Sequence, residues 1–386
     1  MAQKNITISE TVRINSLAIE RQRQGMPVFN LGAGEPVLNT PKIIKQAAQK
    51  ALNENKTLYP PVQGILQLRQ LATVWMNKKF KTSYYPQNVL VTNGGKLGIY
   101  LILQSLLKLG DEVVFSSPYW VSYPGIVKLF GGTAKIIKTS AVSGWKISAN
   151  DLKRACGKKT KILILNNANN PTGALYSKSE LADILNVAAK KNLTTISDEV
   201  YSGLVYDKNK FTSCASFAKH RNRVIVIQSC SKNFAMTGWR VGFVFADEAM
   251  IKELTILLSQ STSGVTTISQ WAAIAALKNP EKFTKPLRLE LQKRRDVLVN
   301  SINKHFNLNL ASPASSLYLF VSLKDLGVAN KSSAHFCMSL LKKTGVALIP
   351  GSACGQEGYV RLTFGAKPQT IKSGIKLLAD YCQKIR

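Results

Sequence analysis

The chain has 386 residues, 45% of them hydrophobic, which is enough for one large domain and one smaller domain with buried cores. Its apolar runs are too short to cross a bilayer and residues 1–10 lack an apolar signal segment, so we expect a soluble, cytoplasmic protein. The six cysteines and three histidines are scattered, which excludes a zinc site and predicts reduced, structural cysteines.

The charge is strongly positive, because 52 lysines and arginines outnumber 21 acidic residues and give a net charge of +31. Such an excess raises the hypothesis of a nucleic-acid partner. The basic residues are spread along the whole sequence, however, without a basic block or an aromatic-basic stripe. We therefore interpret the charge as a general surface property that can attract anionic substrates, and we do not expect nucleic acid or membrane as the main partner.

Short β-branched segments alternate with helix-length amphipathic segments through the middle of the chain. Seven strands are predicted, at 88–93, 112–116, 134–139, 161–166, 194–197, 224–229 and 241–246. Helices are predicted between several of them, for example at 96–109 and 179–191. The pattern favours a mainly parallel sheet covered by helices on both faces. The short connection between 224–229 and 241–246 indicates that one of these two strands runs antiparallel.

A long helix is predicted at about 286–306, followed by strands at 317–323, 346–349 and 359–364. The predicted fold class is α/β, with a large seven-stranded domain at 37–284. A smaller α+β domain is formed by both chain ends, 1–36 and 285–386.

Polar residues come directly after the predicted strands, and in an open parallel sheet ligands bind beyond the carboxyl ends of the strands. These residues include Gly95 and Lys96 after the first strand, Trp120 after the second, Asn170 after the fourth, Asp198 and Tyr201 after the fifth, and Lys232 after the sixth, whose last residue is Ser229. The sequence therefore predicts an amine, a carboxylate, an amide, aromatic rings and an anion-binding turn along one edge.

The glycine pair before Lys96 suits an anion, because the backbone can approach closely and the first N–H groups of a helix are free. A tight turn without a ligand is an equal alternative. Leu90 and Leu97 do not fit a Walker loop, and Val37 does not fit a dinucleotide fingerprint, so nucleotide binding is disfavoured.

Lys232 stands near two hydroxyl groups and Arg240, a set that can bind phosphate. Positive neighbours and desolvation lower the pKa of an amine and make it nucleophilic. Asp198 ends an apolar strand, where it is either a helix N-cap or the partner of a protonated ring nitrogen. Trp120 is either a core residue or a stacking platform.

Together these segments closely resemble the class I aminotransferases of fold type I, the aspartate aminotransferase family, and within it the bacterial aspartate/prephenate branch. The similar segments, in family order, are 34–36, 59–61, 117–120, 170–173, 197–201, 229–232 with 236–242, 350–352 and 360–362. They cover nearly the whole chain.

The resemblance implies a pyridoxal-phosphate-dependent transaminase with ping-pong kinetics, using aspartate and 2-oxoglutarate. Lys232 would hold the cofactor and move a proton, while Asp198 pairs with the ring nitrogen and Tyr201 and Asn170 contact the phenolic oxygen. Trp120 would stack on the ring. The phosphate would be bound by Gly95, Lys96, Ser229 and Arg240, with Tyr59 reaching over from the second subunit of a homodimer. The substrate carboxylate would be held by Arg361, helped by Gly34, Trp120 and Asn170.

The segment 313–318 and the single residue Cys354 depart from the family pattern. In the family, both positions lie near the mouth of the site. Aromatic amino acids or prephenate, alanine and methionine remain alternative substrates. A β-lyase or synthase with the same cofactor is a second alternative, because a fold does not fix a function.

Overall fold

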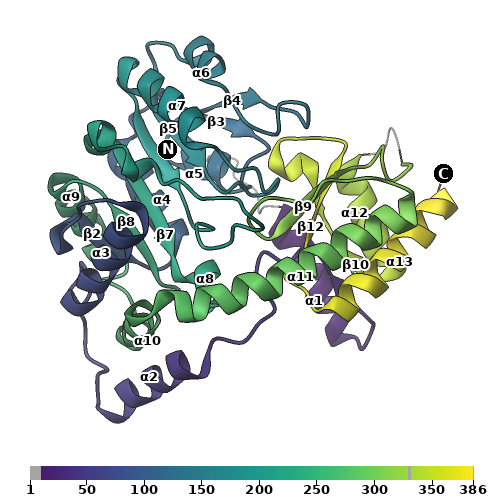
Figure 1. The fold of residues 1–386 in the computed structure, drawn as a ribbon, viewed down its shortest axis with the longest axis horizontal. Coiled ribbons are helices and arrows are strands. Elements are labelled where there is room, and N and C mark those ends of the chain that lie inside the picture. The colour runs from purple at the N-terminus through teal and green to yellow at the C-terminus, as the bar shows by residue number, and fades with distance from the viewer. Residues whose placement is uncertain (1–9, 329–331, 386) are drawn as a thin grey trace.

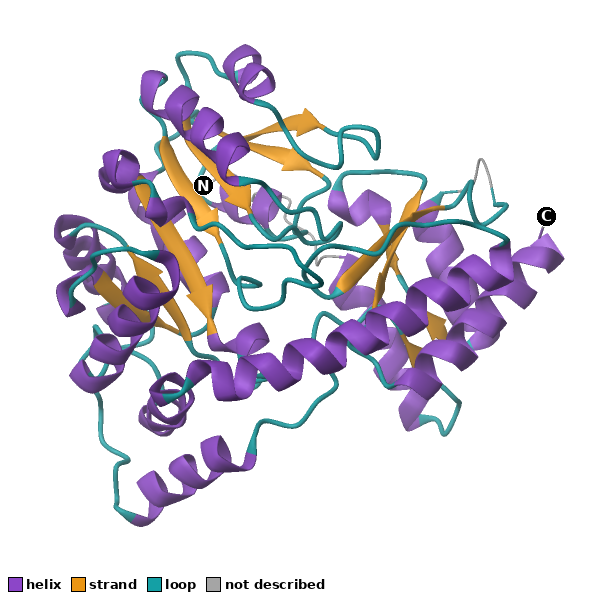
Figure 2. Cartoon of the chain, viewed as in Figure 1, coloured by secondary structure: helices purple, strands orange, loops and turns teal. Residues whose placement is uncertain are grey.

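The computed structural model describes residues 10–328 and 332–385. The outermost residues of the predicted small domain, 1–9 and 386, lie outside the described residues. Figures 1 and 2 show a twisted sheet flanked by helices, and a second group of strands and helices alongside the C-terminal half of the long helix α11 (Pro280–Phe306).

The large sheet has seven strands in the order β2-β8-β7-β6-β5-β3-β4. Its strands are β2 (Val89–Thr92), β3 (Glu112–Ser117), β4 (Thr133–Lys138), β5 (Thr160–Asn166), β6 (Thr194–Asp198), β7 (Val224–Ser229) and β8 (Gly242–Phe245). β8 is antiparallel to both β2 and β7, whereas the other neighbours are parallel. The prediction of a mainly parallel sheet with one reversed strand is confirmed.

Helices cover both faces of this sheet, because its strands are buried and need apolar partners on each side. They include α3 (Leu66–Phe80), α4 (Gly95–Leu106), α5 (Tyr123–Leu129), α6 (Ala149–Ala155), α7 (Lys178–Lys190), α9 (Glu248–Ser259) and α10 (Thr267–Lys278). α2 (Lys42–Asn53) packs on α10, and the short α8 (Cys230–Asn233) directly follows β7. The predicted helices at 96–109 and 179–191 correspond to α4 and α7.

The helix predicted at 286–306 begins six residues earlier, as α11 (Pro280–Phe306). Pro280 occupies the first turn, where a missing N–H costs nothing, and Pro286 lies inside the helix. The predicted start at 286 is wrong because a proline marks the beginning of many helices, whereas Pro286 lies inside a continuous helix.

The second group contains β9 (Tyr318–Ser322), β11 (Ile349–Pro350) and β12 (Tyr359–Thr363) in one antiparallel sheet. The strand predicted at 346–349 is divided, because β10 (Val346–Ala347) instead pairs in parallel with β1 (Phe29–Asn30), which was not predicted. α1 (Glu10–Arg23), α12 (Ser333–Thr344) and α13 (Pro368–Ile385) pack around these strands. The chain ends therefore pack together, although the domain boundaries at 37 and 284 stay a prediction.

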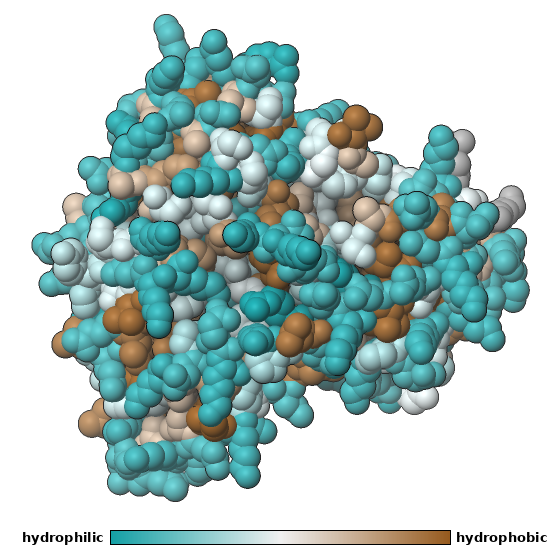
Figure 3. Space-filling view, in the orientation of Figure 1, coloured by the Kyte–Doolittle hydropathy of each residue, from teal (hydrophilic) through white to brown (hydrophobic). Residues whose placement is uncertain are grey.

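The viewed face is mostly hydrophilic, with hydrophobic side chains in small separate groups (Figure 3). Among the described residues no helix combines the length and hydropathy needed to span a membrane. Within 10–328 and 332–385, no three histidine, cysteine or acidic side chains come together as metal ligands.

Candidate active site

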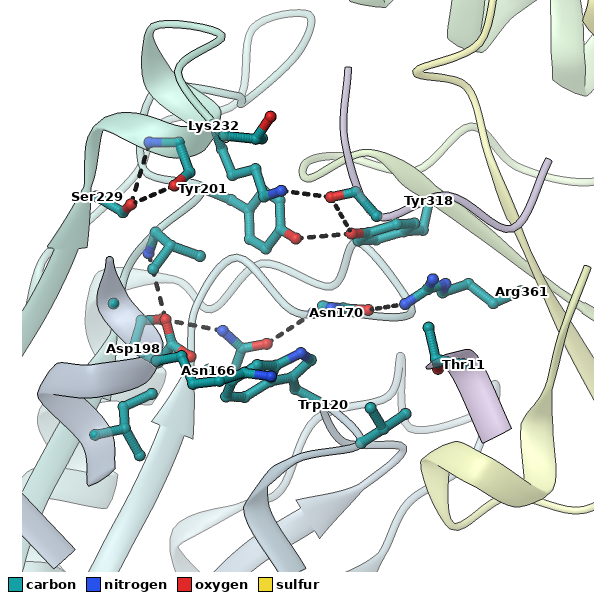
Figure 4. Close-up of a pocket in the computed structure, with 18 of the residues that line it drawn as sticks. Thr11, Trp120, Asn166, Asn170, Asp198, Tyr201, Ser229, Lys232, Tyr318 and Arg361 are labelled. Carbon is teal, nitrogen blue, oxygen red and sulfur yellow. Dashed lines mark hydrogen bonds between the residues drawn. The ribbon is translucent and has the colours of Figure 1, made fainter. Parts of the chain in front are cut away.

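A cavity of about 310 Å³ opens at the carboxyl edge of the large sheet and reaches the strands of the second group. Eleven of the twelve predicted site residues line it, namely Gly34, Gly95, Lys96, Trp120, Asn170, Asp198, Tyr201, Ser229, Lys232, Arg240 and Arg361. Figure 4 shows side chains from distant parts of the chain pointing toward this common space.

Tyr59 is the exception, since it is 92% exposed and lines a separate surface hollow together with residues 262–268. Its predicted contact is with a second subunit, so a single chain leaves that prediction untested.

The turn before α4 forms one end of the cavity. Gly94 adopts a φ of 81°, and a Cβ there would lie 2.4 Å from Nη2 of Arg240, so only glycine fits. Arg240 is held against the turn by hydrogen bonds to the carbonyl oxygens of Thr237 (2.9 Å) and Asn93 (3.2 Å). The free N–H groups at the start of α4 and the guanidinium thus face the same region, as an anion requires.

Ser229 and Ser231 add hydroxyl groups to this end. The Ser229 hydroxyl caps α8 by accepting from the backbone N–H of Ser231 (3.1 Å), and it lies 3.0 Å from the Ser231 hydroxyl. Burial and the nearby Arg240 lower the pKa of Lys96. No salt bridge within the described ranges uses Lys96 or Arg240, so their charges are available to an anion.

Asp198 is the last residue of β6 and is 4% exposed. Its carboxylate accepts a 2.5 Å hydrogen bond from the hydroxyl of Tyr123, and burial raises its pKa to about 6. No lysine, arginine or histidine forms a salt bridge with it in the part of the chain that the structure describes. A buried carboxylate without a cation is costly, so Asp198 suits a cationic ligand atom.

Lys232 lies in α8, directly after β7, and its amine donates a hydrogen bond to the carbonyl oxygen of Gly34. Burial lowers the pKa of this amine to about 8, against a smaller opposing effect of Glu35, and Arg361 and Arg240 lower it further. An amine with such a pKa is partly unprotonated near neutral pH and can act as a nucleophile or a base.

Arg361 lies on β12 at the opposite end of the cavity and is 2% exposed. Its Nη1 donates to Oδ1 of Asn170 (3.1 Å) and its Nη2 to the carbonyl oxygen of Gly32 (2.8 Å), whereas Nε is buried without a partner. No carboxylate of the described residues neutralises this guanidinium, so it is suited to bind a ligand carboxylate.

Aromatic residues form the walls between the two ends. Trp120 packs edge to face on Tyr123, with ring centroids 5.3 Å apart, and the Lys96 amine lies 5.1 Å from the Trp120 ring. The buried hydroxyl of Tyr201 lies 2.8 Å from that of Tyr318. Burial raises the pKa of Tyr201 above its ordinary value, so the phenol stays protonated.

Sequence reasoning missed Tyr123 and Tyr318. Tyr123 begins a short helix whose sequence has no polar pattern, so nothing in the local sequence indicated that Tyr123 contacts a site residue. Tyr318 ends the segment 313–318, whose departures from the family pattern lie at residues 315–317, whereas Tyr318 itself agrees with the pattern, and that agreement was the available signal.

Comparisons with known proteins agree with this geometry. Residues 26–378 match the family model described as aminotransferase class I and II. The chain is 36% identical over 380 residues to a probable aspartate/prephenate aminotransferase of Aquifex aeolicus, covering 98% of this chain and 96% of that protein. It is 33% identical over 374 residues to the aspartate/prephenate aminotransferase of Thermus thermophilus, covering 96% of this chain and 95% of that protein.

Solved structures give the same result. An aspartate aminotransferase of Thermus thermophilus with maleate superposes with a TM-score of 0.92 at 32% identity, covering 97% of both chains. An aspartate aminotransferase of Rhizobium meliloti gives a TM-score of 0.93 at 31% identity, covering 99% of this chain and 98% of that one.

Proposed function

The chain belongs to the class I and II aminotransferases, and we propose that it transfers the amino group of aspartate to 2-oxoglutarate, with pyridoxal phosphate bound to Lys232. One observation carries the proposal. A single cavity holds the amine of Lys232 with its lowered pKa, together with a buried carboxylate and a buried guanidinium that form no salt bridge with any of the described residues.

The residues present fit pyridoxal phosphate, the cofactor of this family. The turn at Gly95, with Lys96, Ser229 and Arg240, would hold the phosphate group. Asp198 would pair with the protonated ring nitrogen, which supplies the cation that this carboxylate lacks. Tyr201 and Asn170 would contact the phenolic oxygen, and Trp120 would stack on the ring. When bound, the cofactor supplies an aldehyde that takes up the amino group and a ring that withdraws electrons.

The protein groups then divide the remaining tasks. Arg361 binds the α-carboxylate and thereby fixes the position of Cα, with Asn170 and Gly34 beside it. Lys232, once released from the cofactor, would be an unprotonated amine that accepts the proton from Cα and donates it to the cofactor carbon that carried the aldehyde. The amino donor and the oxo-acid acceptor both need Arg361 to bind their carboxylate. They therefore bind one after the other, which gives ping-pong kinetics.

Two observations support acidic substrates. Several related proteins are named for aspartate or for aspartate and prephenate. In addition, the cavity lining contains Lys96, Lys232, Arg240 and Arg361 but only one carboxylate, that of Asp198. With Lys232 bound to the cofactor and Asp198 paired with the ring nitrogen, three cations remain against the roughly two charges of a phosphate, so the cavity attracts anionic substrates such as amino and oxo acids. Because relatives are also named for prephenate, that oxo acid is the second candidate acceptor.

We also propose a homodimer in which Tyr59 contributes to the partner's site. Leu58 is 82% and Tyr59 is 92% exposed, beside a hollow of about 650 Å³. Large apolar side chains at such exposure are typical of an interaction surface. Sedimentation of Tyr59→Ala tests subunit association, and its cofactor affinity tests the shared site.

The experiment that tests the main proposal is amino transfer by the purified, cofactor-loaded enzyme. The panel contains aspartate, phenylalanine, tyrosine, alanine and methionine as donors, with 2-oxoglutarate and prephenate as acceptors. Aspartate with 2-oxoglutarate should give the highest kcat/KM. Failure of oxo-acid-dependent exchange with every donor would overturn the proposal, and pyruvate with ammonia formed without an acceptor would favour the β-lyase alternative. Lys232→Ala is the control.

A further inference from the structure

Tyr318 contacts both ends of the proposed substrate site. It is the first residue of β9, is 1% exposed and lines the cavity. Its ring packs edge to face on Tyr201, with centroids 5.9 Å apart, and the two hydroxyl groups are 2.8 Å apart. Figure 4 shows this pair between Lys232 on one side and Arg361 on the other.

The face of the Tyr318 ring supports Arg361. The guanidinium carbon lies 4.2 Å from the ring centroid, within the range of a cation–π contact. Tyr318 pairs with Thr363 across the β9–β12 ladder, so Arg361 is its diagonal neighbour on the same face. The ring therefore stabilises a buried cation that has no carboxylate partner among the described residues, while the hydrogen bonds to Asn170 and Gly32 orient the guanidinium.

The hydroxyl of Tyr318 belongs to a different set of contacts. It lies 3.4 Å from the carbonyl oxygen of Gly34, which also accepts the hydrogen bond of Lys232. The single proton of this hydroxyl has two acceptors, the Gly34 carbonyl and the Tyr201 hydroxyl. When it is donated to Tyr201, the Tyr201 proton is free to point into the cavity.

We propose that Tyr318 is a positioning residue, whose hydroxyl directs the Tyr201 proton toward the cofactor's phenolic oxygen and whose ring holds Arg361 ready for the substrate carboxylate. This inference rests on the proposed function, because Tyr201 and Arg361 act there on cofactor and substrate. The two tasks belong to different atoms of one side chain and can be separated by mutation.

Tyr318→Phe keeps the ring and removes the hydroxyl. When the cofactor's phenolic oxygen accepts a hydrogen bond from Tyr201, a proton next to this oxygen is bound less tightly. If Tyr318 no longer directs the Tyr201 hydroxyl toward the phenolic oxygen, that proton is bound more tightly. The pH midpoint of the visible absorption change of the cofactor-loaded enzyme should rise by about 0.5 to 1 unit. The dissociation constant for maleate, a dicarboxylate probe, should stay within about twofold because the ring remains.

Tyr318→Leu removes the ring as well. It should add a weakening of maleate binding of roughly tenfold, since a desolvated cation–π contact is lost. If Tyr318→Leu does not fold, Tyr318→Met replaces it, because a flexible thioether fills the space without a ring.

A double variant shows whether Tyr318 affects the absorption midpoint by positioning Tyr201 or independently of Tyr201. If Tyr318 acts on the absorption midpoint through Tyr201, then Tyr201→Phe/Tyr318→Phe should have the midpoint of Tyr201→Phe alone. Additive shifts, or an unchanged midpoint in Tyr318→Phe, would overturn the inference about the hydroxyl. Unchanged maleate affinity in the variant without the ring would overturn the inference about Arg361.

Tyr381→Phe is the matched control. Tyr381 is also buried, its hydroxyl bonds to Ser339 (2.8 Å), and the amine of Lys343 lies over its ring, but it lies outside the cavity. It should leave both readouts unchanged. The wild type is measured in parallel: absent absorption and absent amino transfer there would refute the proposed function, whereas a normal wild type with unaffected variants would refute only this inference.

Discussion

The hydroxyl of Tyr123 donates a 2.5 Å hydrogen bond to the carboxylate of Asp198 at the end of β6. Tyr123 is 1% exposed, so its phenol and the carboxylate meet in a region without bulk water. This hydrogen bond opposes the effect of burial, which raises the pKa of Asp198. Tyr123 therefore helps to keep the carboxylate ionised for its proposed pairing with the ring nitrogen.

We expect Tyr123→Phe to raise the pKa of Asp198 and to move the acidic limb of the kcat/KM profile upward by about 0.5 to 1 unit. The measurement is the pH dependence of amino transfer. Tyr176→Phe is the control, since Tyr176 is also buried, but its hydroxyl accepts a hydrogen bond from the backbone N–H of Ile147 and is not bonded to Asp198. An unmoved acidic limb in Tyr123→Phe would contradict the assigned contact.

The lowered pKa of Lys232 predicts how the apoprotein takes up its cofactor. The folded protein releases the amine proton near pH 8, below the ordinary value of 10.5. The uptake rate of pyridoxal phosphate should therefore rise as the pH increases through about 8 and then level off. Stopped-flow absorbance measures the reaction, and Lys232→Arg should show no covalent pigment. A rate that is constant from about pH 7 to 9 would contradict the burial of the amine.

Gly242 allows the close contact between β8 and the turn before α4. A Cβ at this residue would lie 2.6 Å from the backbone of Gly94 and Gly95. Gly242→Ala should displace the proposed phosphate site, weaken cofactor binding at least tenfold and destabilise the protein by about 1–3 kcal/mol. Fluorescence titration and urea unfolding measure these effects. Gly238→Ala should change neither, because nothing lies within 4 Å of a Cβ there.

Arg361→Lys keeps the positive charge and removes the planar fork that bonds to Asn170 and Gly32. The KM for the amino donor should rise about ten- to a hundredfold, more than kcat falls, because a carboxylate loses a bidentate partner. The control is Arg294→Lys. Arg294 is also buried and bonds to backbone carbonyls of Gly365 and Ala366, but it lies outside the cavity. That variant should lose stability and retain its KM.

Glu199 makes stability depend on pH. It is fully buried beside Asp198, and burial raises its pKa to about 7, although Ser197, Ser213 and the backbone of Cys214 donate hydrogen bonds to it. Between its ordinary pKa of 4.5 and about 7 the folded protein retains a proton that the unfolded chain releases, so stability falls as the pH rises through this window.

Glu199→Gln removes this dependence. Relative to the wild type, the variant should gain stability between pH 5 and 8, by an amount on the order of 2–3 kcal/mol. Urea unfolding at both pH values measures the difference. A difference that is the same at both pH values would indicate that Glu199 is ionised throughout.

Much of the site could be predicted because its residues come directly after strands. The alternation of strands and helices predicts a parallel sheet, and the carboxyl ends of parallel strands share one edge. Asn170, Asp198 and Lys232 therefore converge whatever the details of packing. The reversed strand was predictable from the same pattern, because its connection is too short for a crossover.

Other features could not be predicted from local pattern. β1 is two residues long, and its pairing with β10 joins segments more than 300 residues apart. The start of α11 was misplaced because a proline inside a helix and a proline at its start look alike in sequence.

By itself the sequence determined the sheet and its polar edge, since these depend on periodicity and on the residue types at the end of each strand, whereas Gly34 and Arg361 were implied only by the resemblance to a family. Only the tertiary structure decided that Tyr123 holds Asp198 and that Tyr318 holds both Tyr201 and Arg361. The members of these contacts lie 75, 117 and 43 residues apart. Packing of separate elements brings them together, and no local periodicity encodes such packing.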